Sequence, residues 1–279
     1  MAMGSGATRG MHGVSAESSV VVVQRLDASV RAGADAGRVG ADLFSVAALL
    51  DAEPGLRRVV TDPSRAGTAR AELLRGLLSG KIDAAAAEVA AAGAEQRWSA
   101  GRDLGDALEH AGVVAQVVAA EQVGQADELE DELFRFGRIV AAERELREVL
   151  TDRSVPVEHR RELVGSLLGD KATAPTVRLV EQALAGRHRS LAVALDVYQR
   201  VAADRRDRLV ATVRVARPLP EDDKQRLAEA LRRQYDHPVH LNVVVDEDVL
   251  GGLRVEIGDE VIDGTVASRL DDARRRLAG

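Results

Sequence analysis

The sequence predicts a mainly α-helical protein, in which two tandem helical bundles related by internal duplication precede a small α+β module. Apolar residues recur at helical spacing through residues 18–206. Within that region VVTDPSRAGTARAELLRGLLSGK at 59–81 and VLTDRSVPVEHRRELVGSLLGDK at 149–171 agree at ten positions without a gap. After residue 208 the apolar period changes from about 3.6 to 2, which indicates strands.

Composition narrows the class of protein. The chain has 279 residues, of which 46% are apolar and only 2% aromatic, so its cores are built from Ala, Val and Leu, which suit closely packed helices. A formal net charge of −7 argues against a dedicated nucleic-acid binder. Zero cysteines exclude disulfides, thiol catalysis and cysteine-bound metals. No apolar run approaches the roughly 18–20 residues of a membrane span.

The helical part repeats with a constant interval, since Asp62 and Asp152, like every other matched pair, lie 90 residues apart. The stripe Val39, Leu43, Val46 and Leu50 recurs as Leu129, Leu133, Phe136 and Val140. The buried side of a second helix is expected at Leu73, Leu74, Leu77 and Leu78, and again at Leu163, Val164, Leu167 and Leu168. Further helical segments are expected at 18–31, 82–92, 98–110, 112–124, 172–185 and 189–206.

The C-terminal segment predicts three half-buried strands, at 209–215, 239–245 and 253–257. A helix is expected between the first two, in PLPEDDKQRLAEALRRQY, and an amphipathic helix closes the chain at 266–277. The order is therefore β-α-β-β-α. Four regions follow from these patterns: a flexible tail at 1–17, in which Met11 is an alternative start, a first bundle at 18–110, a second bundle at 111–206 and the α+β module at 207–279.

The stretch LNVVVDEDVLGGLRVEIGDEVIDGTVASRL at 241–270 resembles the C-terminal sequence of the delta subunit of F-type ATP synthases. That subunit is the bacterial counterpart of the oligomycin sensitivity-conferral protein. The matching positions are Asp246, Gly251, Gly252, Gly258, Asp263 and Gly264. The extra helical copy and the Ala/Arg-rich composition resemble the enlarged delta subunits of actinobacteria.

The resemblance implies a non-catalytic stator subunit without a cofactor. It would link the alpha subunits of the catalytic head, with the beta subunits as further candidates, to the b subunit of the peripheral stalk. It would thereby couple proton-driven rotation to ATP synthesis. It would lie peripherally at the cytoplasmic face of the bacterial cell membrane, and would touch the membrane only through the complex. The candidate helix-binding groove comprises Leu43, Phe44, Leu133, Phe134, Val117 and Val180.

The residues give less support to a metal site, a phosphate-binding loop or another ligand site. His237 and His240 could be two metal ligands, but they lie at a strand start without cysteine or paired carboxylates, which favours surface histidines. Gly251 and Gly252 lack the Lys-Ser/Thr of a phosphate loop and favour a turn. Trp98 favours core packing over a ligand role. Two alternatives remain: a free-standing scaffold of helical repeats that binds amphipathic helices, and an enzyme with a helical lid over the α+β module.

Overall fold

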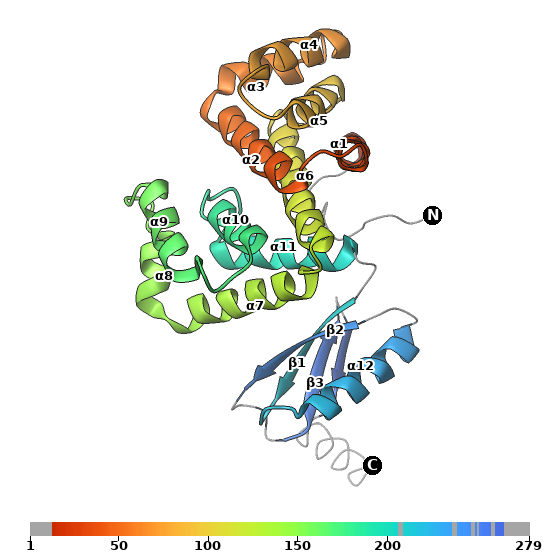
Figure 1. Cartoon of the computed structure of the whole chain (residues 1–279), viewed down its shortest axis with the longest axis vertical. Helices are drawn as coiled ribbons and strands as arrows, with labels where there is room; N and C mark the ends of the chain where they lie inside the picture. Colours follow the sequence, from red (N-terminus) through yellow and green to blue (C-terminus); the bar gives the residue numbers. More distant parts are fainter. Residues whose placement is uncertain are drawn as a thin grey trace, which may run out of the picture. The chain divides into compact units, whose positions relative to one another are not determined.

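The computed structural model describes residues 13–205, 209–235, 239–246, 249, 251–257 and 260–264 (Figure 1). The chain divides into two compact units, one ending at Ala202 and the other beginning at Ala203. The first unit is helical, and the second contains a four-stranded sheet. The predicted fold class, mainly helical with a small α+β module at the C-terminus, is confirmed at this level.

The first six helices are α1 (Val14–Arg31), α2 (Ala36–Ala52), α3 (Pro54–Thr61), α4 (Gly67–Leu78), α5 (Ala84–Glu95) and α6 (Arg102–Gln122). Local sequence explains where several of them begin. The side chain of Asp35 accepts from the Arg38 amide at 3.0 Å before α2, and Asp83 accepts from the Ala85 amide at 2.8 Å before α5. Pro54 occupies the first turn of α3, where its missing N–H costs no hydrogen bond.

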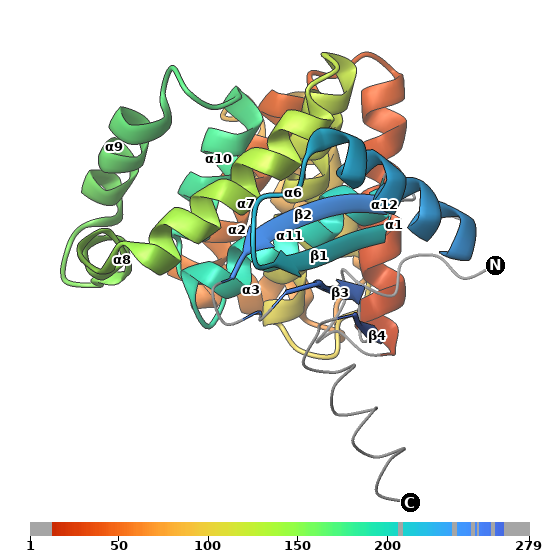
Figure 2. The same ribbon diagram turned by 90° about the horizontal axis from the view of Figure 1, so that it is seen from below.

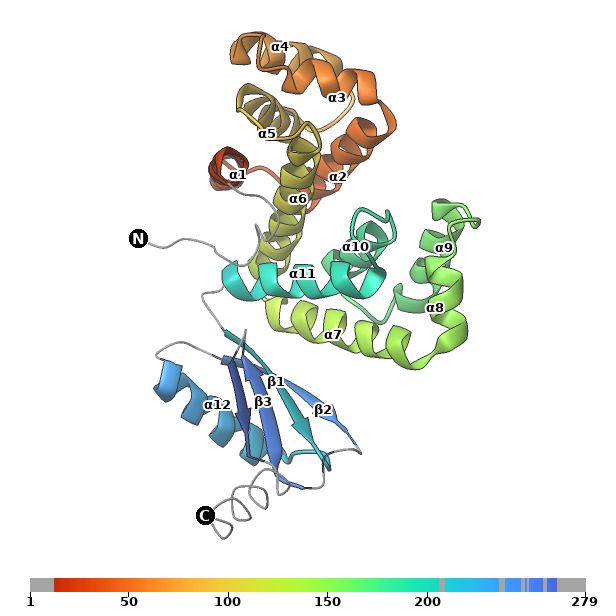
Figure 3. The same ribbon diagram turned by 180° about the vertical axis from the view of Figure 1, so that it is seen from behind.

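The next five helices are α7 (Ala126–Ala142), α8 (Arg144–Thr151), α9 (Val157–Leu168), α10 (Ala174–Ala183) and α11 (Leu191–Arg205), seen from behind in Figure 3. Helices α7, α8 and α9 begin and end 90 residues after α2, α3 and α4, and α10 begins 90 residues after α5. The helix breaks therefore follow the interval found in the sequence. We call α2–α5 the first copy and α7–α10 the second copy.

The residues shared by the two copies make the same local hydrogen bonds. Asp62 Oδ1 accepts from the Ser64 amide at 2.9 Å and from its hydroxyl at 2.7 Å. Asp152 does the same for Ser154, at 2.8 and 2.7 Å. Each aspartate stabilises the turn between two short helices, because its carboxylate accepts the amide and the hydroxyl of the turn serine two residues later. These bonds explain why both copies carry the Asp-x-Ser sequence.

A shared arginine fixes the same turn from the next helix. Arg70 in α4 is buried and donates to backbone carbonyl oxygens of Asp62, Arg65, Ala94, Glu95 and Gln96. Arg160 in α9 donates to the carbonyl oxygens of Leu150, Val155 and Leu184. In both copies the guanidinium, with five donors in a fixed plane, satisfies carbonyls at helix ends that helical hydrogen bonding leaves open.

Helix α6 differs from the prediction. The break expected between 98–110 and 112–124 is wrong, because α6 is continuous, and the expected bundle boundary at 110/111 lies inside it. Helix α2 packs along α6. A Cβ atom at Gly112 would lie 2.5 Å from a ring carbon of Phe44, so only glycine fits this close approach. Gly112 therefore marks tight packing between α2 and α6 inside a continuous helix.

The leucine-rich faces of α4 and α9 are buried over a narrower stripe than predicted. Leu74, Leu78 and Val164 are buried, whereas Leu73, Leu77 and Leu167 are 45%, 36% and 37% exposed. Helices α4 and α9 lie at the periphery and pack against α5 and α10 respectively, so only one edge of each apolar face meets the core. The prediction that all of these leucines are buried is therefore wrong.

The second unit forms a mixed sheet in the order β2-β1-β3-β4, viewed from below in Figure 2. Its strands are β1 (Leu209–Val215), β2 (Val239–Val245), β3 (Leu253–Ile257) and β4 (Glu260–Asp263). β1 and β2 are parallel, joined by the crossover helix α12 (Glu221–Tyr235), and the other two pairings are antiparallel. The core of this unit includes Ala211, Val213, Val255 and Leu231 of α12.

The three predicted strands are confirmed, but β4 was not predicted. It has only four residues, too few for an alternating pattern to stand out, and it is defined by its pairing with β3, in which Val255 lies opposite Ile262. The helix predicted at 266–277 lies outside the described residues. Within the described part of the second unit the order is β-α-β-β-β.

Candidate functional site

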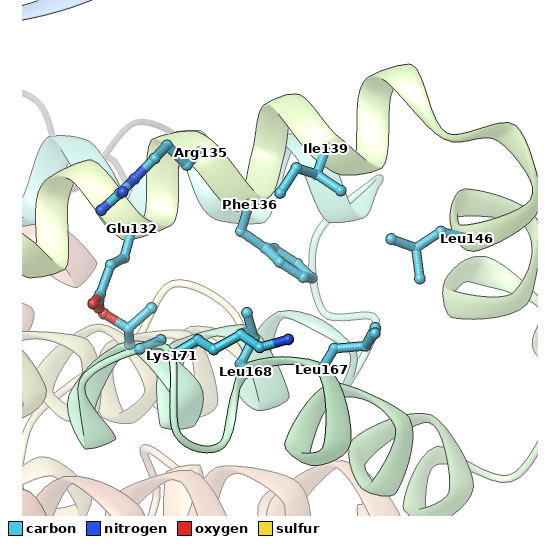
Figure 4. Close-up of a pocket in the computed structure, with 10 residues that line it drawn as sticks. Glu132, Arg135, Phe136, Ile139, Leu146, Leu167, Leu168 and Lys171 are labelled. Carbon is cyan, nitrogen blue, oxygen red and sulfur yellow. The ribbon is translucent and has the colours of Figure 1, made fainter.

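A pocket of about 300 Å³ opens between α7, α8, α9 and the turn before α10 (Figure 4). Its lining is Glu132, Arg135, Phe136, Ile139, Leu146, Leu167, Leu168, Lys171, Ala172 and Thr176. The base is apolar: the ring of Phe136 is 3% exposed, while Ile139 and Leu167 are 50% and 37% exposed at the rim. Exposed apolar side chains around a cavity are typical of a surface that binds another apolar group.

The charged groups of the pocket are one carboxylate, which is hydrogen-bonded within the protein, and two cations. Glu132 Oε2 accepts from the amide and the hydroxyl of Thr173, both at 2.9 Å, and so ties α7 to the start of α10. Arg135 donates to the carbonyl of Asp131 on its own helix at 3.3 Å and is exposed. Lys171 runs along the opposite side of the pocket in Figure 4. Lys171 and Arg135 therefore contribute positive charge at the rim.

The residues predicted to line a helix-binding groove are mostly core residues instead. Leu43, Leu133, Val117 and Val180 are at most 1% exposed, Phe44 is 8% exposed and Phe134 is half-buried. Amphipathic spacing selected these positions because it selects the buried stripe. The pocket residues were missed, although Ile139 carried a usable signal: it is a large apolar residue beside the buried stripe of α7, not within it.

An ionic cluster around the buried side chain of Arg187 joins α2, α6 and the segment between α10 and α11, all within the first unit. The side chain of Arg187 is 7% exposed and contacts the carboxylates of Asp51 on α2 and of Asp106 and Glu109 on α6. The Asp106 and Glu109 contacts are 2.5 and 3.2 Å long. Two further donors reach Glu109 Oε1 at 2.9 Å, the Gln182 amide and the Tyr198 hydroxyl.

The cluster sets the ionisation of Glu109. Burial by itself would raise the pKa of this carboxyl, but hydrogen bonds from His188 and Gln182, with the positive charge of Arg187, outweigh burial and lower it. Tyr198 responds in the opposite direction, because burial and the neighbouring Glu109 carboxylate raise its pKa well above the ordinary value. Glu109 is therefore ionised and Tyr198 neutral at physiological pH. This arrangement ties α6 to α10, to α11 and to the segment between them within the first unit.

The lowered pKa predicts an acid-dependent loss of stability. The contribution of Glu109 is fully present above its unfolded pKa, near 4.5, and is lost as pH falls through the lower folded pKa. Between pH 7 and about pH 3.5, we expect the unfolding free energy of the Glu109→Gln protein to fall less than that of the wild type. Urea denaturation at each pH measures the unfolding free energy of both proteins. An equal fall of that free energy with pH in the two proteins would contradict the prediction.

The C-terminal positions singled out in the sequence lie in the connection between β2 and β3 and at the end of β4. The Asp246 amide donates to the Val215 carbonyl at 2.9 Å, and its carboxylate lies 3.5 Å from Arg214 Nη1. Gly251 and Gly252 have φ angles of +110° and +81°, which confirms the predicted turn. The Gly264 amide donates to the Leu253 carbonyl at 2.9 Å, directly after Asp263 ends β4. Gly258 lies outside the described residues.

The histidines and Trp98 have structural surroundings in the part of the chain that the structure describes. Among the residues that the structure describes, no group of three or more His, Asp or Glu side chains could hold a metal ion. His237 lies outside that part, and His240 falls in β2. Trp98 is partly buried, packs against the core and donates its indole N–H to the Gly93 carbonyl at 2.9 Å. No described helix is long and apolar enough to cross a membrane.

The fold and pocket define a class of protein: a helical unit with an apolar surface pocket, followed along the chain by a small mixed α+β unit. Comparisons with known proteins all point to one family. The family model described as ATP synthase delta (OSCP) subunit matches residues 114–277. The ATP synthase subunit delta of Streptomyces coelicolor is 48% identical over 271 residues, which are 96% of this chain and 99% of that protein. That of Kineococcus radiotolerans is 49% identical over 269 residues, covering 96% and 98%.

The chain therefore belongs to the ATP synthase delta (OSCP) subunit family, and its resemblance to the enlarged actinobacterial form is confirmed. The family model begins at residue 114, so the first copy lies outside it, whereas the bacterial relatives cover both copies. Among solved structures, a chain of the Toxoplasma gondii mitochondrial ATP synthase hexamer matches 60% of this chain and 95% of its own length, with 16% identity and a TM-score of 0.37.

Proposed function

We propose that this chain is a non-catalytic stator subunit of an F-type ATP synthase. It links the alpha subunits of the catalytic head, through its helical unit, to the b subunit of the peripheral stalk, through its α+β unit. By holding the head against the rotor it couples proton-driven rotation to ATP synthesis. The complex places it peripherally at the cytoplasmic face of the bacterial cell membrane. The observation that supports the proposal most strongly is near-complete alignment with relatives named ATP synthase subunit delta.

Two separate surfaces suit the proposed division of labour. The helical unit offers the apolar pocket between α7 and α10, a shape that accepts side chains of an amphipathic helix. The α+β unit presents Val245 on β2 and Val261 on β4, which are 45% and 50% exposed and lie on the two edge strands of the sheet. Exposed apolar residues on sheet edges favour a protein partner over water.

We propose that the helical unit arose by internal duplication. Three features support this: the constant interval between matched residues, the helix bounds that follow it, and the repeated hydrogen bonds. A capping contact across each copy adds to them, since Asp42 accepts from the Asp83 amide at 2.8 Å and Glu132 accepts from the Thr173 amide at 2.9 Å. Each acceptor lies 90 residues from its counterpart, as does each donor.

Truncation tests the division of labour. A fragment of residues 1–206 is expected to bind a peptide of the alpha N-terminal segment with the affinity of the full chain, and to lose the b subunit. The helical unit ends at Ala202 as a compact unit with its own core, so the fragment keeps that core intact. Calorimetry with each partner measures both affinities. Full affinity of the fragment for b would contradict the proposal.

Purification from membranes separates the stator from the alternative of a free-standing scaffold. A tagged full chain expressed in its own organism is expected to elute with the catalytic-head and b subunits. Elution with other helical partners, and with none of the synthase subunits, would support the scaffold and contradict the stator. The purified chain alone is expected to neither bind nor hydrolyse ATP, which equilibrium dialysis and a phosphate-release assay measure.

A further inference from the structure

We propose that a second pocket of the helical unit, where the end of α8 meets the segment between α10 and α11, binds a phosphate group. The pocket has a volume of about 570 Å³. It is separate from the apolar pocket described above, because the two share no lining residue. The proposal concerns neither the alpha contact nor the b contact, and so goes beyond the stator role.

Positive charge gathers in the lining of this pocket, although the whole chain has a net charge of −7. Three arginines and one histidine line it, Arg153, Arg160, Arg189 and His188, and no lining residue is an Asp or a Glu. The guanidinium group presents N–H donors in a plane that matches the oxygen atoms of a phosphate, and hydrogen bonds between charged groups are stronger than neutral ones. The lining therefore favours an anion with several oxygen atoms.

The repeat shows which of these arginines the fold itself uses. Arg160 donates to three backbone carbonyl oxygens, as its counterpart in the first copy also does to carbonyls at helix ends. Arg153 and Arg189 are exposed, and the first copy has Pro63 and Ser99 at the equivalent positions. Within the part of the chain that the structure describes, neither of these two side chains forms a hydrogen bond or an ion pair. Their donors are therefore available to a ligand.

Two carboxylates adjoin residues of the pocket, and both are engaged by other groups. Glu109 Oε2 lies 3.5 Å from His188 Nε2, but the same oxygen lies 3.2 Å from Arg187 and the side chain of Glu109 is 6% exposed. Asp152 accepts from the amide and the hydroxyl of Ser154. Neither carboxylate lines the pocket, so neither takes the place of a bound anion there.

The rest of the lining selects the kind of phosphate. In proteins, carboxylates hold the magnesium ion that accompanies nucleotide phosphates, and the lining has none, so the pocket suits a phosphate without a metal. The hydroxyl oxygen of Ser190 accepts from the Val193 amide at 3.2 Å, which leaves its hydrogen for a ligand oxygen. Leu150, Leu184 and Leu191 also line the pocket, which is large enough for an organic group beside the phosphate. The ligand is therefore free phosphate or a phosphate monoester.

Titration of the full chain with inorganic phosphate, at constant ionic strength, tests the proposal. We expect saturable changes in the NMR signals of arginine Nε–H groups and of the amides of residues 184–191. Saturation is expected at millimolar concentrations, because water and salt weaken contacts of exposed charges. Arg153→Gln and Arg189→Gln are each expected to weaken binding by about fivefold, and the double variant to remove saturable binding.

Another exposed arginine of the second copy supplies the matched control. Arg138 on α7 lies outside the pocket lining, so Arg138→Gln is expected to leave the affinity for phosphate within about twofold. Thermal unfolding checks that all variants fold like the wild type, as expected for exposed positions. An equal loss in Arg138→Gln, no loss in the double variant, or the absence of saturable binding of both inorganic phosphate and phenyl phosphate to the wild type would overturn the site.

Phenyl phosphate and magnesium ATP distinguish the sources of the phosphate group. Tighter binding of phenyl phosphate than of inorganic phosphate would support a site for an organic monoester, and equal or weaker binding would support a site for the free ion. Magnesium ATP is expected to leave the signals unchanged. If magnesium ATP bound as tightly as inorganic phosphate, the assignment to a metal-free phosphate would be overturned.

Discussion

Replacing Arg187 by methionine is expected to lower the unfolding free energy of the helical unit by about 3 kcal/mol. Methionine keeps much of the packing volume but leaves the 6%-exposed carboxylate of Glu109 without its cationic partner. Removing one member of a buried ion pair is costly because the other charge stays desolvated and uncompensated. Urea denaturation followed by circular dichroism measures the loss.

The arginine 90 positions earlier provides the control for this substitution. Arg97 precedes Arg187 by 90 residues and is exposed, so Arg97→Met is expected to change the unfolding free energy by less than about 0.5 kcal/mol. Adding Glu109→Gln to Arg187→Met is expected to recover part of the loss, because the uncompensated charge is then removed. A loss as large for Arg97→Met, or no recovery in the double variant, would show that the ionic cluster does not stabilise the unit.

Substituting Gly252 by valine is expected to destabilise the α+β unit by about 2 kcal/mol and to abolish binding of the b subunit. The φ angle of Gly252 is +81°, a region in which a β-branched side chain clashes with its own backbone. Gly252 directly precedes β3, the strand that pairs with both β1 and β4, so a displaced turn disturbs the sheet. Calorimetry with b and hydrogen exchange of the β3 amides measure the effect.

Asparagine separates backbone strain from side-chain bulk at this position. It tolerates positive φ better than other residues with a side chain, so Gly252→Asn is expected to retain most of the stability and b binding. The helical unit should unfold at the same urea concentration in all three proteins. If Gly252→Asn were as damaging as Gly252→Val, close packing around the turn, and not its φ angle, would be the cause.

Sequence periodicity determined the elements that depend on local rules. The stripe beginning at Leu129 gave α7, and alternation at Val239–Val245 gave β2, because side-chain direction repeats with the period of each element. The turn at Gly251–Gly252 followed from residue type alone. The turns at the two Asp-x-Ser sequences are also set locally, because the aspartate carboxylate accepts from the backbone amide of the serine two residues later.

The candidate site depended on contacts that periodicity does not encode. A stripe identifies apolar residues but not which edge of it a neighbouring helix covers, so Leu43 was assigned to a groove and Ile139 was overlooked. Likewise, nothing near Arg187 in sequence indicates the carboxylates of Asp51 and Glu109. The sequence by itself thus determined the repeated stretch, most of the helices and three of the four described strands, but not the short helices α3 and α8 or the continuity of α6. Only the tertiary structure decided that Ile139, Leu167 and Ala172 line one pocket, because an opening is set by packing between helices.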